Sequence, residues 1–439
     1  MKLPENITKA LEILTYGGFE AFVVGGCVRD MIMGRVPVDY DITTNALPTQ
    51  TAACFKDYRV IETGIKHGTV TVVINGENIE ITTYRVDGEY LDNRRPEKVS
   101  FTLSVEEDLA RRDFTMNAIC FNPTSGTIDP FDGEGDIKKG IIRCVGDPDT
   151  RFNEDGLRIL RALRFASQTG FEIDAETAGS IRKNKNLIKN LSAERVFSEL
   201  KKLLCGKFAH RILNDYYEVI AVFIPEIMPM VGFEQNTRYH HLDVFGHTLE
   251  ALKNSEADHI VRLAVFLHDI GKPAAFYADA DGTAHFKGHA RISAEIAKKI
   301  LKRLKADNET LSKVCGLITM HSDSISDVKF FVSEKGFDFT KLLIKVKKAD
   351  ASAKAPGFRE VPELDSAQDL VEKLEKSGEP LFLKDLAVSG NDITVLGAKG
   401  KKVGEVLAFL LKSVLSEETE NTKDKLLKKA EEYLTHEKD

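Results

Sequence analysis

Asp39 and Asp41 stand two residues apart in the stretch VPVDYDI, which has the composition of a β-strand. Because side chains at positions i and i+2 of a strand point to the same face, we expect these carboxylates about 6.5 to 7 Å apart. Hard divalent cations take oxygen ligands, and a pair of them about 3.5 to 4 Å apart can activate an attacking hydroxyl and stabilise a departing pyrophosphate. The spacing therefore predicts a Mg²⁺ site in which both aspartates are metal ligands and catalytic residues. Glu80, in NIEITTYR, is either a third carboxylate of this site or a solvated strand residue.

Two glycines precede the aspartates. Gly25 and Gly26 lie between the apolar run FVV and the helix-like segment CVRDMIMG. Without a Cβ atom they let the backbone approach a phosphate closely, and a following helix N-terminus would direct N–H groups at the anion. Arg29 adds a cation in the first turn. Together with the aspartate pair, this pattern predicts a site that binds a nucleoside triphosphate and its metal ions, although the chain contains neither a P-loop nor a Rossmann glycine fingerprint.

Three arginines, Arg158, Arg161 and Arg164, recur at three-residue spacing in NEDGLRILRALRF and share one face of a helix. Their charges repel one another unless something anionic or rich in acceptors lies there, such as a triphosphate or a base edge. Asp155 can accept a hydrogen bond from an exocyclic amine, and Arg158 can donate to a ring nitrogen or a carbonyl. Cytosine and adenine present an amine beside an acceptor, whereas uracil and guanine present a carbonyl and an N–H. This pair therefore predicts selection of C and A.

A second group of metal-ligand residue types lies in the later part of the chain. His268 and Asp269 are adjacent at the end of the apolar segment VFLHDIGK. Imidazole together with carboxylate suits Mn, Fe, Co, Ni or Zn. Since a single helical histidine is usually a packing or surface residue, the prediction depends on the whole series. The predicted ligands are His247, His268, Asp269, His289, His321 and Asp350.

The elements that must position these residues change character along the chain. Up to about residue 148, runs rich in β-branched and aromatic residues alternate with helix-like segments, which predicts a mixed α/β head. The remainder shows mostly helical periodicity. The 439 residues carry a net charge of −7 and six scattered cysteines without a Cys-x-x-Cys pair, which favours a reducing, cytoplasmic environment. The N-terminal segment is predicted to form an amphipathic helix rather than a signal peptide. The sequence has no apolar run of about 20 residues, so no membrane span is predicted.

Several of these motifs resemble those of the class II tRNA nucleotidyltransferases, the CCA-adding enzymes, within the polymerase-β-like superfamily. VVGGCVRDMIMGRVPVDYDITTNALP is similar to their metal and triphosphate motif, RRDFTMNAI at 111–119 to their ribose-contacting motif, and EDGLRILRALRF to their amino-acid template for CTP and ATP. DGEYLDNRRPEKVSF, at 87–101, stands where that family has a flexible loop tied to the switch from C to A addition. FEIDAETAGSIRKNKNLIKNLSAERVFSELKKLL resembles its RNA-binding helices, and the His and Asp series resembles the HD phosphohydrolase superfamily.

The resemblance implies addition of C, C and A to the 3′ end of tRNA from CTP and ATP with Mg²⁺, and a phosphohydrolase activity of the HD domain with a transition metal. It implies an α+β chain with a polymerase-β-like nucleotidyltransferase head at 1–148, a helical neck and RNA-binding-like region at 149–235, an HD domain at 236–355 and a C-terminal helical tail at 356–439. The implied nucleotide-binding residues are Gly25, Gly26, Arg29, Arg111, Arg112, Asp113, Asp155, Arg158, Arg161 and Arg164.

Other activities are compatible with parts of the same pattern. Relatives that share the head add only CC, add only A, or make poly(A) tails, and a full-length loop argues against the first of these. A protein-modifying uridylyltransferase also joins such a head to an HD domain, but the Asp155–Arg158 pair argues against it. A non-catalytic tRNA-binding protein would require damaged metal sites, yet Asp39 and Asp41 are present. The sequence predicts no oligomeric state.

Overall fold

The computed structural model describes residues 1–61, 63–65, 68–88, 99–280 and 282–436. It divides the chain into two compact units, one formed by residues 1–228 with 303–306 and the other by 229–302 with 307–439. The predicted division into four domains is finer than this and stays a prediction. Most of the predicted loop at 87–101 lies outside the described residues. Among the described helices, none is long and apolar enough to cross a membrane.

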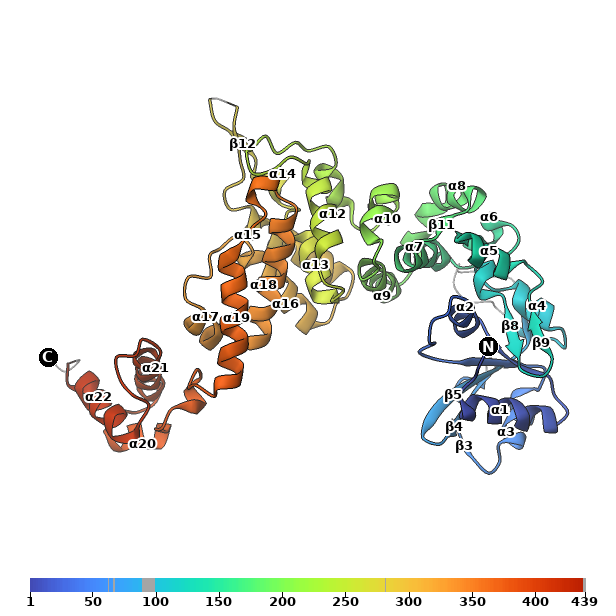
Figure 1. The fold of residues 1–439 in the computed structure, drawn as a ribbon, viewed down its shortest axis with the longest axis horizontal. Coiled ribbons are helices and arrows are strands. Elements are labelled where there is room, and N and C mark those ends of the chain that lie inside the picture. Colours follow the sequence, from blue (N-terminus) through green and yellow to red (C-terminus); the bar gives the residue numbers. More distant parts are fainter. Residues whose placement is uncertain (62, 66–67, 89–98, 281, 437–439) are drawn as a thin grey trace. The chain divides into compact units, whose positions relative to one another are not determined.

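A seven-stranded sheet forms the centre of the head (Figure 1). Its spatial order is β3 (Arg59–Ile61), β4 (Thr69–Ile74), β5 (Glu77–Thr83), β2 (Asp41–Thr44), β1 (Ala21–Val24), β8 (Cys120–Asn122) and β9 (Gly126–Ile128). Strands β2 and β5 run parallel, whereas β1 is antiparallel to both of its neighbours, β2 and β8. The sheet is therefore mixed, and the predicted α+β class is confirmed.

Strands β4 and β5 alternate between buried and more exposed side chains, whereas all four residues of the central strand β1 are buried. In β5, Ile79 and Ile81 are buried whereas Glu80 between them is exposed. Successive strand residues point to opposite faces, so Glu80 lies on the face opposite Ile79 and Ile81. Helices α1 (Glu5–Tyr16) and α3 (Pro48–Cys54) lie together beside β3, β4 and β5 in Figure 1.

Strand β2 begins at Asp41, so Asp39 lies in the preceding segment and the expectation of one strand carrying both aspartates is wrong. Asp41 pairs with Val24, the last residue of β1. The chain then turns at Gly25, whose φ of 77° is in the left-handed region, so β1 offers no partner to the residues before Asp41. Pro37 also lacks a backbone N–H, and Val38 is 99% exposed. The same-strand rule therefore does not fix the geometry of Asp39.

The rest of the first unit is mainly helical. Helix α7 (Leu157–Thr169) buries its apolar face and packs against α9 (Ala193–Leu204). The other elements are α2 (Gly26–Ile32), β6 (Arg85–Asp87), β7 (Val99–Phe101), α4 (Val105–Ala110), α5 (Gly133–Lys139), β10 (Ile141–Ile142), α6 (Pro148–Glu154), β11 (Glu172–Ile173), α8 (Ala175–Asn184), α10 (Ala209–Asp215) and α11 (Tyr217–Ile220).

In the described part of the second unit, the elements are helices apart from one short hairpin. Helices α12 (Val244–Asn254), α13 (His259–Leu267), α16 (Asn308–Met320) and α18 (Phe337–Ser352) contact one another (Figure 1). The other elements are α14 (Lys272–Ala275), β12 (Tyr277–Ala278), β13 (Ala284–His285), α15 (His289–Arg303), α17 (Val328–Lys335), α19 (Pro362–Ser377), α20 (Gly390–Val395), α21 (Lys401–Leu415) and α22 (Lys423–His436). An apolar cluster that includes Val371, Ile393 and Leu410 joins the later helices.

Candidate functional site

Three carboxylates gather at one edge of strand β2 in the head. Asp41 stands in register with Glu80 across the parallel pair β2 and β5. Partial burial raises the pKa of Asp41, and the charges of Asp39 and Glu80 raise it further, against the lowering effect of Arg112. A divalent cation would relieve this repulsion, so the donor set fits Mg²⁺. Of the two interpretations of Glu80, its position favours the first.

The glycine turn lies beside these carboxylates. A Cβ atom on Gly25 would stand 3.0 Å from Nη1 of Arg112 and would take up a backbone conformation that L-residues rarely adopt. Gly25 is thus required by its φ, and the neighbouring guanidinium leaves little space for a Cβ atom. Arg29 is held by Asn117, whose Oδ1 accepts from Arg29 Nη1 at 2.8 Å, and by Asp30 at 2.8 Å.

Arg111, Arg112 and Asp113 follow helix α4. Both arginines form ion pairs with Asp108, which is buried. Asp113 is 8% exposed and accepts from Arg161 Nη2 at 2.7 Å and from Asn117 Nδ2 at 3.0 Å. Burial alone would raise the pKa of Asp113, but the charge of Arg161 and these hydrogen bonds lower it to about 2. Asp113 therefore orients Arg161 as an ionised partner.

The predicted base-reading pair lies at the junction of two helices. Helix α6 ends at Glu154, Asp155 is extended, and α7 begins at Leu157. Oδ1 of Asp155 accepts from the backbone N–H of Leu157 at 3.0 Å, and Oδ2 accepts from Arg195 Nη2 at 2.7 Å. Arg158 donates to Glu154 Oε2 at 2.5 Å and to two backbone carbonyls, those of Arg151 at 3.2 Å and Arg111 at 2.9 Å. Both side chains are therefore fixed.

Protein carboxylates neutralise the three arginines of this helix. Glu154 pairs with Arg158, Asp113 with Arg161, and Glu199 with Arg164 at 3.2 Å. The repulsion inferred from the sequence is thus relieved by the protein itself and does not by itself require an anionic ligand. Arg161 keeps the most exposed side chain of the three, at 33%. It remains the member of this face best placed to meet a ligand.

Sequence reasoning missed several residues that hold these side chains. Asp108 could have been found, because it precedes Arg111 and Arg112 by three and four residues, which is ion-pair spacing on a helix. Glu199 follows its partner Arg164 by 35 residues, so no local signal pointed to it. Asn117 and Arg195 were missed for the same reason: their contacts are made by the fold.

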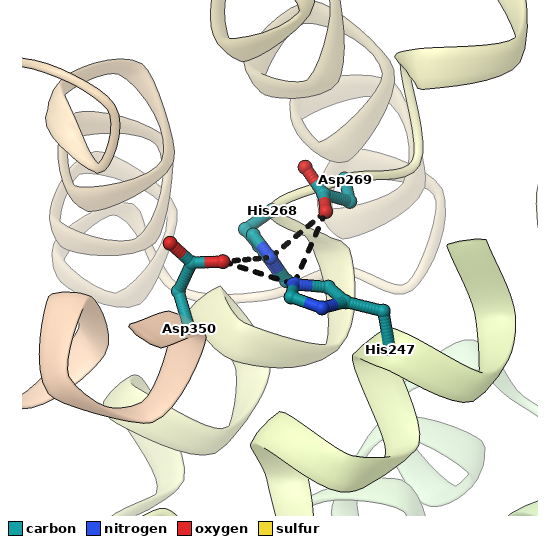
Figure 2. Close-up of side chains that lie close together, drawn as sticks. All are labelled: His247, His268, Asp269 and Asp350. Atoms are coloured by element: carbon teal, nitrogen blue, oxygen red, sulfur yellow. Dashed lines mark hydrogen bonds and ion pairs between the residues drawn. The ribbon is translucent and has the colours of Figure 1, made fainter. Parts of the chain in front are cut away.

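The second site brings all six predicted HD residues together from five helical segments. His247 Nε2 lies 2.9 Å from Asp350 Oδ1, and His268 Nε2 lies 3.1 Å from Asp269 Oδ2 (Figure 2). Figure 2 shows both imidazoles pointing between the two carboxylates. On the other side of Asp269, Oδ1 lies 3.4 Å from His289 Nε2 and 3.8 Å from His321 Nε2. The carboxylate of Asp269 therefore faces two imidazole pairs.

Backbone contacts orient the four histidines. Nδ1 of each ring lies at hydrogen-bonding distance from a backbone carbonyl, at 2.7 Å for His268, 2.8 Å for His289, 2.6 Å for His321 and 3.3 Å for His247. With the proton on Nδ1, each Nε2 keeps its lone pair for the centre. Such outer contacts are typical of histidines that bind metals. The backbone thus prepares four imidazole ligands.

This cluster fits a transition metal. Among the described residues, the groups of three or more His, Cys, Asp or Glu ligand atoms within 4.8 Å of one another are His247, His268, Asp269 and Asp350, and Asp269, His289 and His321. His268 Nε2 and Asp269 Oδ1 are buried and are satisfied only by ion-pair contacts within the cluster, since neither makes a well-aligned hydrogen bond with the described residues. Burying charged groups is costly unless they are well paired or bind a metal ion. Burial would lower the pKa of His268, but Asp269 and Asp350 raise it to about 10. Without a metal the His268 imidazole therefore carries a second proton, which a cation bound at Nε2 would replace.

A cavity of about 1560 Å³ opens over the HD cluster. Cationic and aromatic side chains line it together with the metal-ligand types. They include Arg238, Tyr239, His240, Lys272, Tyr277, Lys287, Lys347 and Lys354. Lys272 is buried and its Nζ lies 2.7 Å from Asp269 Oδ2. The cavity thus combines positive charge with ring surfaces, which suits an anionic ligand with an aromatic part.

Three family models match successive parts of the chain. Residues 21–143 match the poly A polymerase head domain, residues 170–230 match a probable RNA and SrmB-binding site of polymerase A, and residues 237–355 match the HD domain. A solved structure, that of a Bacillus stearothermophilus CCA-adding enzyme in complex with CTP, superimposes with a TM-score of 0.75 at 29% identity and covers 100% of both chains. A Thermotoga maritima CCA-adding enzyme complexed with tRNA shares the fold, with a TM-score of 0.58 at 19% identity over 98% of this chain and 96% of that chain.

Curated relatives agree with this fold. A CCA-adding enzyme of Geobacillus thermodenitrificans (strain NG80-2) is 50% identical over 209 residues, a match that spans 47% of this chain and only about half, 51%, of that relative. The CCA-adding enzyme of Geobacillus sp. (strain WCH70) is 35% identical over 442 residues and covers 99% of this chain and 98% of the relative. Because this second match extends over nearly the whole of both proteins, the chain belongs to the family of CCA-adding enzymes.

Proposed function

We propose that the chain adds C, C and A to the 3′ end of tRNA, from CTP and ATP and without a nucleic-acid template. The convergence of Asp39, Asp41 and Glu80 beside the Gly25 turn is the observation that carries this proposal. Mg²⁺ held by Asp39 and Asp41 would supply Lewis-acid stabilisation of the triphosphate and the attacking hydroxyl. Arg29, Arg112 and Arg161, each fixed by a protein carboxylate, provide oriented N–H donors for the nucleotide.

The hydrogen bonds of Asp155 and Arg158 support a base-reading role. Arg158 has five N–H donors, and described residues take three of them. The remaining two can meet the acceptors on the edge of cytosine or adenine. Each oxygen of Asp155 already accepts one hydrogen bond and retains a lone pair for the exocyclic amine. Because Arg195 and Glu154 fix the two side chains, the same pair can present one constant pattern to both bases.

Extension of three trimmed tRNAs tests this proposal. Transcripts ending before C74, C75 and A76 are incubated with Mg²⁺ and each labelled NTP alone, and the products are resolved at single-nucleotide length. We expect C on the first two transcripts, A on the third, and no U or G. Addition of C alone or of A alone would identify a partial activity, long A tails would identify a poly(A) polymerase, and no addition at all would contradict the proposal. Labelling of protein by UTP would favour the uridylyltransferase.

We further propose that the HD cluster hydrolyses phosphoesters. The two ligand groups that share Asp269 support this second activity, and a transition metal bound there would supply Lewis-acid chemistry. Lys287 and Lys354, which line the cavity, would attract the phosphate of the substrate. The substrates we propose are 2′,3′-cyclic phosphates or damaged RNA ends.

We also propose a cytoplasmic location. It is supported by the six cysteines, all of which are free thiols in the structure. Such isolated thiols are typical of proteins in a reducing compartment.

A further inference from the structure

The carboxylate of Asp108 connects four segments of the head. Asp108 lies on α4 and is fully buried. Its Oδ1 accepts from Arg111 Nη2 at 2.7 Å and from the backbone N–H of Arg85, at the start of β6, at 3.3 Å. Its Oδ2 accepts from Thr43 Oγ1 at 3.2 Å and from Arg112 Nη2 at 3.3 Å. A buried carboxylate without such partners would be strongly destabilising, so the partners identify Asp108 as an ionised anchor.

Thr43 places this anchor on the face of the sheet that carries the site. Thr43 and Asp41 are two residues apart in β2, so their side chains share one face. In register with them, Glu80 and Thr82 occupy the same face of β5. Asp108 therefore attaches α4 to the strand that begins with the proposed metal ligand.

Arg112 extends from the anchor toward the glycine turn. Its Nη2 is bound by Asp108, while its Nη1 lies 3.0 Å from the position that a Cβ atom of Gly25 would take. Its charge reaches Asp41. The buried Nε of Arg112 makes no hydrogen bond with the described residues. One nitrogen of the guanidinium, Nη2, is thus bound by Asp108, and donors remain for a ligand at the turn.

We propose that Asp108 is a positioning residue for nucleotide binding, which holds the Arg112 guanidinium beside Gly25 and Asp41 so that it meets the phosphates of CTP and ATP. This inference rests on the proposed nucleotidyl transfer and adds a residue to it. Since the contact is with phosphate, which both substrates share, Asp108 acts equally on C and A addition. Choice of base belongs to Asp155 and Arg158 and is independent of Asp108.

Steady-state tRNA extension with Asp108→Asn tests the inference. The substitution replaces the negative carboxylate with a neutral amide, whose NH₂ group faces Arg111 or Arg112 and cannot accept their hydrogen bonds. We expect the KM for CTP and for ATP to rise by the same factor, about tenfold, with kcat changed by less than about threefold, because uniform binding is lost. Discrimination against UTP and GTP should stay as in the parent. An unchanged KM would overturn the inference, as would a change in base discrimination.

A matched control is available in the same unit. Asp136 is also buried and also accepts from a threonine hydroxyl, Thr115 Oγ1 at 2.7 Å, and from an arginine, Arg143 Nε at 3.2 Å. Asp136→Asn therefore reports the general cost of removing a buried charge, and we expect its KM values to equal those of the parent. Equal increases in KM for both variants would reduce Asp108 to a structural role.

A double-mutant cycle separates positioning from folding. If Asp108 acts through Arg112, Asp108→Asn should raise KM little further in an Arg112→Ala background, whereas independent effects would multiply. If Asp108→Asn does not fold, Thr43→Val provides the test. It removes one hydrogen bond to Oδ2 and keeps the shape, and we expect KM to rise about threefold. A normal KM in Thr43→Val, or multiplying effects in the cycle, would overturn the inference.

Failure of the inference is distinguishable from failure of the proposed function. The parent protein is first tested for tRNA extension and, by equilibrium dialysis, for binding of labelled CTP. If the parent neither extends tRNA nor binds CTP, the proposed function fails and the inference fails with it. If the parent is active and Asp108→Asn retains the parental KM and CTP affinity, only the inference about Asp108 is wrong.

Discussion

Asp41 stands directly opposite Glu80 on the neighbouring parallel strand, in the middle of the head's sheet. Asp39 adds a third carboxylate just before the strand begins. Burial raises the pKa of Asp41, and the charges of Asp39 and Glu80 raise it further, because acidic groups so close together disfavour one another's ionised forms. A sheet centre that accumulates negative charge in this way is stabilised by a cation, and the nearby Gly25 turn and Arg112 offer a close backbone approach and a positive charge to the phosphates that such a cation would bind.

Asp41→Asn and Asp39→Asn should each abolish addition of both C and A. An amide keeps the shape of the carboxylate but loses its charge, so metal stabilisation worth several kcal/mol is removed and the rate should fall about a thousandfold or more. Glu80→Gln should have a smaller effect, about tenfold. Single-turnover tRNA extension measures each rate. Asp57→Asn, an exposed head carboxylate without a hydrogen bond among the described residues, is the control, and near-normal turnover of Asp41→Asn would place the active site elsewhere.

Asp155→Asn should relax the choice of nucleotide more than it weakens binding. The new amide can donate to a carbonyl, which uracil and guanine present where cytosine and adenine have an amine. We expect the ratio of kcat/KM for CTP over UTP to fall by about tenfold or more. Glu199→Gln is the matched control. It removes the carboxylate that pairs with Arg164, which lies on the same helix as Arg158, and it leaves Asp155 and Arg158 unchanged. Normal C and A addition with unchanged exclusion of U would show that the base is read elsewhere.

Local sequence signals predicted the strands well. Alternating β-branched residues in TVTVVI and ENIEITT correspond to β4 and β5, whose alternate residues are buried. They could not predict that Asp39 lies outside β2, because this depends on where the neighbouring strand β1 ends.

The six HD residues were predicted from an adjacent His–Asp pair and from family resemblance, and the fold brings them together.

Partners of the arginines were beyond local reasoning. Thr43 and Asp108 are 65 residues apart, and Arg161 and Asp113 are 48 apart, yet both pairs are in contact. Spacing rules describe neighbours on one element and say nothing of contacts between elements. The sequence therefore predicted an arginine face and assigned its neutralisation to a ligand, whereas tertiary structure supplies the carboxylates.

Asp113→Asn should lower the stability of the head in a pH-dependent way. The charge of Arg161 lowers the pKa of Asp113 to about 2, below its unfolded value of about 3.9. The ionised form therefore stabilises the fold above pH 4, by about 3 kcal/mol, and this contribution is lost as the pH falls from about 4 toward 2. Calorimetric unfolding of parent and variant should show a difference that is constant from pH 5 to 7 and shrinks below pH 4. A difference that grows on acidification would contradict the assignment of Asp113 as an ionised partner.

The two metal sites should work independently, because their ligands belong to separate compact units. His268→Ala removes an imidazole from the HD cluster and should abolish hydrolysis of a 2′,3′-cyclic nucleotide phosphate with Mn²⁺, Co²⁺ or Ni²⁺, while tRNA extension with Mg²⁺ stays within about twofold of the parent. Asp41→Asn should do the reverse. Metal content after dialysis gives a second measurement: the parent and Asp41→Asn should retain the transition metal, and His268→Ala should lose it. His259→Ala, at the exposed start of the same helix α13, is the control. If the parent binds no transition metal and hydrolyses no phosphoester, the HD domain is only a structural part of the chain, and the four imidazoles oriented by backbone carbonyls are not metal ligands.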